Sequence, residues 1–240
     1  MRTLILAVQF LTRLPTPQLK TFDPAWLADA ARWFAVVGLL VGACVAAPLA
    51  LLAPLDPWLA ALAAWLAWAW VTGGLHLDGL ADLADAQGAA HRSRERFLEV
   101  LKDPHVGSFG VIVLIGQMAA KLVLLMLAAR HALWPALVLI PAWARLSAVA
   151  WSSTLPALSA GSGERFAWRS HWPSFWLSAA LLAVLSALTA PALLVAPAVG
   201  LFWWAYLKRK LGGMTGDCLG AGIEVSETLL LTACVVFALA

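Results

Sequence analysis

The sequence predicts an all-α fold: a polytopic transmembrane helical bundle of about seven spans, with a short interfacial or re-entrant helix at the N-terminus. Two observations support this. Of the 240 residues, 62% are hydrophobic and only 12% are charged, whereas a soluble domain carries about 25% charged residues. The apolar residues also form long blocks separated by polar segments, the pattern of helices that cross a bilayer. We therefore expect residues 1–240 to form a single integral membrane domain.

The expected helices follow from the lengths of these blocks. The first block, residues 4–11, is too short to cross a bilayer, which needs about 20 residues, so we expect it to lie at the interface or to re-enter. The predicted spans are 33–54, 57–75, 107–129, 132–155, two shorter spans within 174–207 that are broken near residues 189–191, and 223–240. The polar segments 76–106 and 156–173 and the basic, Gly-rich loop 208–222 connect them.

The basic residues give an independent check on the number of spans. With seven spans, thirteen of the sixteen Lys and Arg residues fall on one side of the membrane. They are Arg2, Arg13, Lys20, Arg32, Arg92, Arg94, Arg96, Lys102, Arg165, Arg169, Lys208, Arg209 and Lys210. Cytoplasmic loops carry an excess of Lys and Arg, so we expect this side to be cytoplasmic and the protein to reside in the inner membrane of a bacterial cell.

An acidic cluster follows the second predicted span. Asp78, Asp82 and Asp85 are spaced i, i+4 and i+7, which places three carboxylates on one face of a helix. No Lys or Arg occurs nearby in the sequence to relieve their repulsion, but a hard cation such as Mg²⁺ or Mn²⁺ would. Single acidic residues at span ends are ordinarily solvated caps, whereas three in register favour a metal site. His76 is a candidate metal ligand, base or interfacial residue.

A second acidic cluster lies before and within the last predicted span. Asp217, Glu224 and Glu227 are spaced i, i+7 and i+10 and again fall close to one helical face. The glycines that precede them let the backbone approach a ligand closely. Both acidic clusters lie at cytoplasmic span ends in the predicted topology, so we expect them to meet across the bundle.

Several polar groups are candidates for binding phosphate. Lys102, His105 and the glycine turn at residues 107–110 precede a predicted helix, and a helix N-terminus favours anions. Arg145 lies within a span, where an ionised side chain is expected to face the bundle interior and to pair with a carboxylate or a phosphate. Carboxylates, Mg²⁺ and basic groups on one side suit the transfer of a phosphoryl-linked group between a soluble and a membrane-associated substrate.

Four sequence blocks, in this order, resemble the cobalamin synthase family, whose members are adenosylcobinamide-GDP ribazoletransferases. The blocks are Phe10-Leu-Thr-Arg13-Leu-Pro15, Thr72-Gly-Gly-Leu-His76-Leu-Asp78-Gly-Leu-Ala-Asp82-Leu-Ala-Asp85, Lys102-Asp103-Pro-His-Val-Gly107 and Gly212-Gly-Met-Thr215-Gly-Asp217-Cys-Leu-Gly-Ala221. The resemblance covers residues 10 to about 227. The family usually has a polar residue where this chain has Leu77 and Leu83, but the three aspartates are kept.

The resemblance implies a Mg²⁺-dependent reaction in the inner membrane. Adenosylcobinamide-GDP would be joined to α-ribazole or its 5′-phosphate, giving adenosylcobalamin or its 5′-phosphate and GMP. The implied catalytic candidates are His76, Asp82, Glu224 and Glu227, and Glu224 and Glu227 could also serve as metal ligands. The implied substrate-binding candidates are Arg13, Lys102, Asp103, Arg145 and Thr215, and the implied metal ligands are Asp78, Asp82, Asp85 and Asp217. The expected partners are these substrates and the lipid bilayer; nucleic acid is not expected, and homo-oligomerisation stays open.

Two other functions compete with this interpretation. CDP-alcohol phosphotransferases also use an Asp-Gly-rich acidic motif and a divalent metal, but an Ala-Arg pair soon follows their Asp-Gly. Here Leu80, Ala81 and Asp82 follow Asp78-Gly79, so that arginine is missing. A cation or small-solute transporter would also need acidic clusters, although such sites lie near mid-membrane rather than at span ends on one side.

Overall fold

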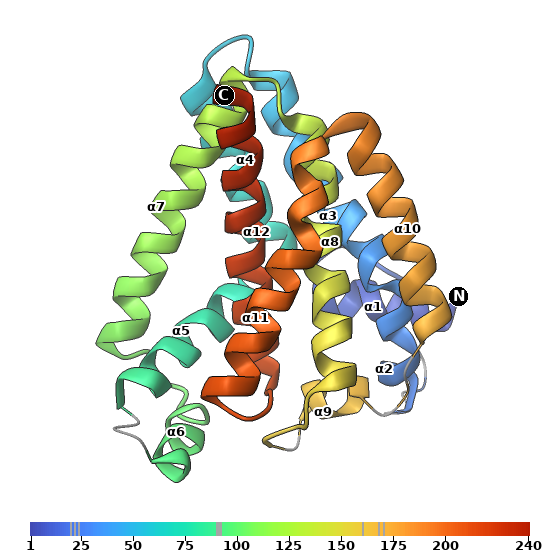
Figure 1. Ribbon diagram of the computed structural model, residues 1–240, viewed down its shortest axis with the longest axis vertical. Coiled ribbons are helices and arrows are strands. Elements are labelled where there is room, and N and C mark those ends of the chain that lie inside the picture. Colours follow the sequence, from blue (N-terminus) through green and yellow to red (C-terminus); the bar gives the residue numbers. More distant parts are fainter. Residues whose placement is uncertain are drawn as a thin grey trace.

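A computed structural model describes residues 1–19, 21, 23, 25–89, 93–159, 161–167, 169 and 171–240. Over these residues the chain forms twelve α-helices (Figure 1). They are α1 (Arg2–Leu11), α2 (Ala25–Ala30), α3 (Phe34–Leu52), α4 (Pro57–Thr72), α5 (Leu75–Ala89), α6 (Arg94–Val100), α7 (Ser108–Arg130), α8 (Trp134–Thr154), α9 (Ser162–Ala167), α10 (Trp172–Thr189), α11 (Ala196–Lys210) and α12 (Gly216–Leu239). The predicted all-α fold is confirmed.

Six helical segments are long and apolar enough to cross a membrane, and the bent pair α4–α5 raises the number of candidate spans to seven. This agrees with the predicted bundle. Three bounds differ from the prediction. The first span begins at Ala25, because α2 continues through a turn of 3₁₀ helix into α3. The second apolar helix ends at Thr72, and the last helix begins at Gly216, where the Thr215 side chain accepts a hydrogen bond from the Cys218 backbone N–H.

The junction between α4 and α5 is a sharp break. Gly73 and Gly74 both have positive φ, +64° and +73°, and the two helices are bent by 84°. Residues other than glycine rarely adopt this left-handed conformation. A Cβ atom at Gly73 would also lie 2.3 Å from Nε of Arg13. The two glycines therefore turn α5 out of the direction of α4 and leave room for Arg13 beside the break.

Small residues let the central helices pack closely. A Cβ atom at Gly38 would lie 2.4 Å from the Ala142 Cα atom, and one at Gly42 would lie 2.3 Å from the Val138 carbonyl oxygen. Glycines four residues apart on one face are a common way for membrane helices to approach each other. Helix α3 therefore lies directly against α8.

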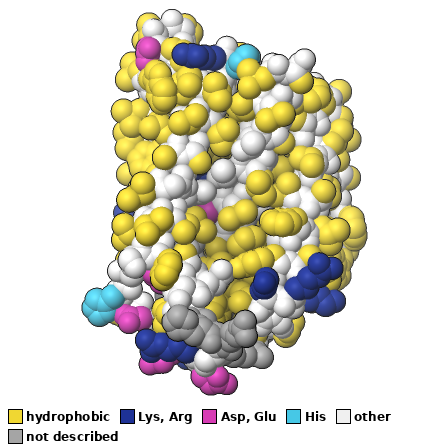
Figure 2. Space-filling view, turned by 60° about the vertical axis from the view of Figure 1, so that its left-hand side comes forward, with side chains coloured by type: hydrophobic (Ala, Val, Ile, Leu, Met, Phe, Trp, Pro, Cys, Tyr) yellow, Lys and Arg dark blue, Asp and Glu magenta, His cyan; other side chains and the backbone are white. Residues whose placement is uncertain are grey.

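The charged side chains lie mainly at the two ends of the molecule, and a hydrophobic band separates them (Figure 2). Helices α2, α6 and α9 lie at one end, and the C-terminus lies at the other (Figure 1). Arg96 belongs to α6, Arg165 belongs to α9 and Arg32 follows α2, so these helices carry basic residues of the predicted cytoplasmic set at one end of the molecule. Lys20 and Arg92, which are also in that set, lie outside the described residues.

Candidate active site

The two acidic clusters meet where α5 crosses α12. A Cβ atom at Gly79 would lie 2.9 Å from the Asp217 carbonyl oxygen, and one at Gly220 would lie 3.5 Å from the His76 Cα atom. Glycine at these two positions lets the helices touch backbone to backbone. The crossing places Asp78 and Asp82 of α5 beside Asp217 in the first turn of α12. The expectation that the clusters meet across the bundle is therefore confirmed for these three residues.

These three carboxylates are accessible and carry no counter-charge. Asp78 is exposed, and Asp82 and Asp217 are half-buried. Asp78 and Asp217 both act electrostatically on Asp82. None of the three forms an ion pair within the part of the chain that the structure describes. In the same residues no three Asp, Glu, His or Cys side chains converge tightly enough to hold a metal ion by themselves.

Asp85 has a partner of a different kind. Its carboxylate oxygens accept hydrogen bonds from the backbone N–H groups of Gly107 (2.7 Å) and Gly110 (2.9 Å) at the start of α7. A Cβ atom at either glycine would lie within 2.5 Å of the carboxylate. Asp85 thus satisfies N–H groups that a helix start leaves without intrahelical partners, and its negative charge suits the positive end of the helix dipole. Its assignment to a metal stays a prediction.

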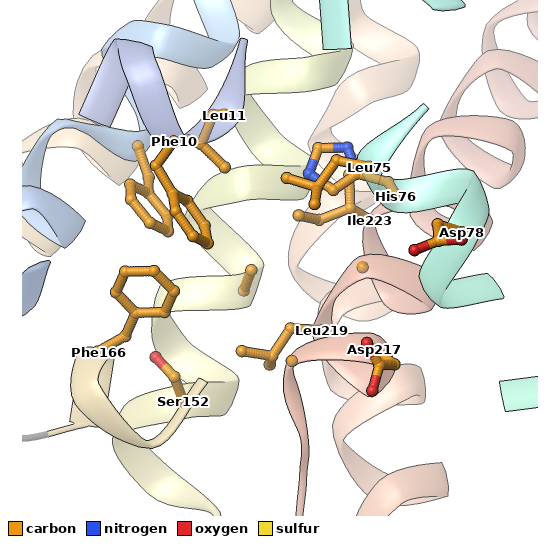
Figure 3. A pocket seen from close by; sticks show the side chains of 14 residues that line it. Phe10, Leu11, Leu75, His76, Asp78, Ser152, Phe166, Asp217, Leu219 and Ile223 are labelled. Atoms are coloured by element: carbon orange, nitrogen blue, oxygen red, sulfur yellow. The ribbon is translucent and has the colours of Figure 1, made fainter. Parts of the chain in front are cut away.

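Two pockets adjoin the carboxylates. The first, which we call the aromatic pocket, has a volume of about 100 Å³ and is shown in Figure 3. It is lined by Phe10, Leu11, Phe34, Leu75, His76, Asp78, Ala148, Ser152, Phe166, Gly216, Asp217, Leu219, Gly220 and Ile223. The second, the arginine pocket, has a volume of about 550 Å³ and is lined by Gln9, Phe10, Thr12, Arg13, Thr72, Gly73, Gly74, Leu75, Asp78, Ala81, Val106 and Leu114. Phe10, Leu75 and Asp78 line both, so the pockets meet at Asp78.

Arg13 is held at the mouth of the arginine pocket by the chain that follows α1. Its backbone N–H donates to the Val71 carbonyl oxygen at 2.8 Å, and its side chain lies over Gly73 and is exposed. Thr12 ends α1, and its hydroxyl donates to the Val8 carbonyl oxygen. The exposed guanidinium on this fixed backbone is suited to an anionic group of a ligand in that pocket.

The loop between α6 and α7 leads to the same pocket through Val106. Lys102, Asp103 and His105 are exposed on this loop. Oδ1 of Asp103 accepts a hydrogen bond from the His105 backbone N–H (3.0 Å) and lies 2.7 Å from Nδ1 of the His105 ring. These hydrogen bonds with His105 hold the pKa of the Asp103 carboxyl below its usual value. Lys102 lines neither pocket, so its predicted contact with a phosphate stays a prediction.

Deeper in the bundle, Glu224 and Glu227 lie in a buried ionic network. Nζ of Lys121 is 2.7 Å from a carboxylate oxygen of each glutamate. Nη1 of Arg145 is 2.8 Å from Oε1 of Glu227, and Gln117 donates to Glu224 at 2.9 Å. Buried charges in a membrane protein are stabilised by such pairing. The network joins α7, α8 and α12, and its two cations balance its two anions.

His76 connects this network to the aromatic pocket. Its ring is buried, Nδ1 lies 3.4 Å from Nη2 of Arg145, and Nε2 has no hydrogen-bond partner among the described residues. His76 lines the aromatic pocket (Figure 3). Arg145 was predicted to pair with a carboxylate or a phosphate, and it pairs with the Glu227 carboxylate. The structure places Glu224 and Glu227 with these cations and away from the exposed carboxylates.

Two features of this region were not predicted from the sequence. Lys121 and Gln117 were not assigned to the site, although an ionised side chain inside a span is itself a signal of a buried partner. Phe10 was given no function beyond its place in a motif. Thr215, a substrate-binding candidate, is buried and caps α12 through its side chain, a role that Thr ahead of a helical segment commonly has.

Comparisons with known proteins agree with the resemblance seen in the sequence. The chain matches the family described as cobalamin-5-phosphate synthase over residues 3–235. It is 71% identical over 238 residues to the adenosylcobinamide-GDP ribazoletransferase of Laribacter hongkongensis, covering 98% of this chain and 97% of that protein. The enzymes of the same name from Thiobacillus denitrificans and Novosphingobium aromaticivorans are 57% and 50% identical, each covering 96% of this chain and 94% and 95% of their own. No solved structure matches the chain.

Proposed function

The chain belongs to the cobalamin-5-phosphate synthase family and is an adenosylcobinamide-GDP ribazoletransferase, and we propose that the transfer takes place where the two pockets meet at Asp78. A single observation supports this location. Asp78 lines both the aromatic pocket and the arginine pocket, so a ligand in either pocket could reach the same carboxylate. The family assignment sets aside the CDP-alcohol phosphotransferase and transporter interpretations.

The reaction joins two molecules at one phosphorus atom. A ribose hydroxyl of α-ribazole or its 5′-phosphate attacks the phosphorus next to cobinamide. A P–O bond forms there, the anhydride bond to GMP breaks, and GMP leaves with its electron pair. The proton of the hydroxyl passes to a base. We assign this base to Asp82, one turn after Asp78 on α5, and a positioning function to His76.

We assign the diphosphate of adenosylcobinamide-GDP to the arginine pocket. Arg13 offers an exposed guanidinium there, and Lys102 stands on the loop that ends at Val106 of the same pocket. An arginine can bind two phosphate oxygens with its planar fork. The larger volume and greater exposure of this pocket also suit the bulkier substrate. Asp103 holds the turn of this loop, which supports its candidate role in positioning Lys102.

The accessible carboxylates suit Mg²⁺. Mg²⁺ commonly uses only one or two protein carboxylates together with substrate phosphates and water, and seldom a cage of protein ligands alone. Asp78, Asp82 and Asp217 are hard oxygen donors without an ion-pair partner among the described residues. Because no three Asp, Glu, His or Cys side chains of the described residues are placed to hold a metal ion by themselves, substrate phosphates and water would have to complete the coordination. When bound, Mg²⁺ would neutralise charge on the diphosphate and on the leaving GMP. The Asp85 carboxylate accepts hydrogen bonds from backbone N–H groups at the start of α7. Asp85 would therefore hold α5, the helix that carries Asp78 and Asp82, in place.

The position of this site supports a proposed orientation in the membrane. The accessible carboxylates, Arg13 and Lys102 belong to the end of the bundle that carries most of the basic residues. By the bias of Lys and Arg toward cytoplasmic loops, we place this end in the cytoplasm and the protein in the inner membrane. Soluble nucleotide substrates would then reach the site without crossing the bilayer. Homo-oligomerisation is compatible with this arrangement and is not required by it.

The test is release of GMP by the purified protein in detergent. The mixture holds adenosylcobinamide-GDP and α-ribazole 5′-phosphate, with Mg²⁺ or with EDTA. We expect release only when both substrates and the metal are present, and we expect Asp78→Asn to lower it at least ~100-fold, the scale of one lost transition-state contact. Glu99→Gln is the control, because Glu99 is exposed on α6, lines neither pocket and forms an ion pair with Arg96. Equal activity of the Asp78→Asn and control variants would refute the proposed location.

A further inference from the structure

We propose that the aromatic pocket receives the azole base of the ribazole substrate and thereby sets which bases the enzyme accepts; this rests on the proposed function. The pocket is divided into an apolar and a polar side. Phe10 and Phe166 lie on one side of the view, Asp78 and Asp217 lie on the other, and Leu219 lies between them (Figure 3). A ligand with a flat apolar ring on one end and a charged group on the other matches this division.

Three phenylalanines build the apolar side from elements far apart in the sequence. Phe166 of α9 makes edge-to-face contacts with Phe10 of α1 and with Phe34 of α3, each with ring centroids 5.0 Å apart and planes at 73°. Phe34 and Phe166 are buried. Aromatic rings in this arrangement favour a further planar ring in contact with them. The pocket thus offers an aromatic wall to a heterocycle.

The hydrogen-bonding groups on this wall are few. Apart from His76 and the two aspartates, the only polar side chain that lines the pocket among the described residues is Ser152, whose hydroxyl already donates to the Val149 carbonyl oxygen at 3.1 Å. A guanine placed against the phenylalanines would have the Ser152 hydroxyl oxygen beside it as one acceptor for several amide and amino hydrogens, and each group left without a partner costs binding energy. An azole joined to ribose has one remaining ring nitrogen and otherwise apolar edges, so this wall favours the azole over the guanine of the other substrate.

Size supports the same assignment. The pocket has a volume of about 100 Å³, whereas a corrin ring with its side chains is far larger and could not enter it. The adjoining arginine pocket, at about 550 Å³, is the roomier of the two.

The direction of the pocket agrees with the chemistry. With the base against Phe166, the ribose of the substrate would extend toward Asp78 and Asp217 at the opposite side (Figure 3). That is the side shared with the arginine pocket, where the diphosphate of the second substrate is proposed to lie. Burial of the base would therefore hold the attacking ribose in place beside the phosphorus. Productive orientation of two reactants is a large part of catalysis in such reactions.

Ala148 provides the first test. This residue lines the pocket from α8, so Ala148→Leu would fill part of the space that the base needs. We would measure kcat/KM for the 5′-phosphates of two α-ribosides, one of benzimidazole and one of its 5,6-dimethyl derivative. We expect the variant to lower kcat/KM for the dimethylated substrate at least ~10-fold more than for the smaller one, since each methyl group in such a pocket can count for ~10-fold or more. KM for adenosylcobinamide-GDP should stay unchanged.

A second variant is expected to change the base preference in the opposite direction, and a third variant serves as a control. Leu219→Ala enlarges the same pocket from α12, so we expect the dimethylated substrate to gain relative to the smaller one. Ala150→Leu makes the same change as Ala148→Leu two residues along α8, but Ala150 lines a separate apolar groove, so base preference should not change. Leu219→Ala keeps the test decisive if Ala148→Leu does not fold.

The outcomes separate the two proposals. An active wild-type enzyme whose base preference is the same in all three variants would overturn the pocket assignment and leave the proposed function intact. A change in KM for adenosylcobinamide-GDP alone would also overturn it, because the pocket would then hold the other substrate. Absence of GMP release by the wild-type protein would instead overturn the proposed function itself.

Discussion

Replacing Lys121 by Met should destabilise the protein through one identifiable carboxylate. Lys121 contacts Glu224 and Glu227, each at 2.7 Å. After the substitution Glu227 would keep Arg145 at 2.8 Å, but Glu224 would keep only the hydrogen bond from Gln117. Met is the appropriate replacement because Nζ of Lys121 lies 4.1 Å from the ring centroid of a tryptophan, and a methionine sulfur also packs well on an aromatic ring. The substitution therefore removes the charge and keeps most of the packing.

The size of the effect follows from the burial of the partners. Lys121, Glu224 and Glu227 are all almost completely buried. Removing one member of a buried ion pair costs about 3–5 kcal/mol, because the other charge is left uncompensated. For a chain of this length, 1 kcal/mol shifts the melting temperature by about 2–4 °C. We therefore expect Lys121→Met to melt roughly 6–20 °C below the wild type.

The assay is thermal unfolding in detergent, followed by circular dichroism, of a double-mutant cycle. Glu224→Gln alone leaves Lys121 with Glu227, and Lys121→Met with Glu224→Gln removes one charge of each sign. The double variant leaves a balanced pair of Arg145 and Glu227. We expect it to recover most of the loss, to within about 1 kcal/mol of the wild type. A Lys121→Met protein as stable as the wild type, or a double variant less stable than both single variants, would refute this reasoning.

Three further predictions concern the site. Asp82→Asn should lower GMP release at least ~100-fold while leaving the melting temperature unchanged, which a paired turnover and unfolding assay would check. Gly79→Val should abolish turnover by forcing α5 away from Asp217, whose carbonyl oxygen would lie 2.9 Å from the new Cβ atom. Gly116→Val, at a glycine with nothing within 4 Å of an added Cβ atom, is its matched control, and equal activity of the two would contradict the close crossing. Asp85→Ala should destabilise the protein by about 1–2 kcal/mol through loss of the α7 cap, and an unchanged unfolding curve would show that the cap is dispensable.

Much of the fold could be predicted because the bilayer imposes a simple rule on sequence. The apolar blocks were sufficient to predict the spans. The distribution of Lys and Arg was sufficient to predict which polar segments lie at the same end of the bundle. The bend at Gly73 was not predicted as a helix-to-helix break, because two glycines after an apolar block equally suggest an ordinary loop. The start of α12 at residue 216 could have been found from Thr215, since Thr followed by an acidic residue in the first turn is typical of a helix start.

The site was predictable only in part. The spacing of Asp78, Asp82 and Asp85 identified the helix, but not that Asp85 turns to α7, because that contact depends on glycines more than twenty residues away. The same limit applies to Lys121, whose partners lie 103 and 106 residues further along the chain. Periodicity reports which side chains share a face. It does not report what stands opposite that face.

The acidic residues of α5 and α12 differ in whether a cationic side chain is paired with them. Spacing alone groups Asp217 with Glu224 and Glu227, because all three fall near one face of α12. The helix, however, runs from the accessible end of the bundle into its interior. A carboxylate buried there is expensive unless a cation accompanies it, and both glutamates have one. Asp217 remains near the surface, where water can solvate it and no cation is needed. A carboxylate that needs no partner in the folded protein is also the one free to bind a metal or a substrate. We therefore assign a structural role to the buried Glu224 and Glu227, and the binding of metal and substrate to the aspartates near the surface.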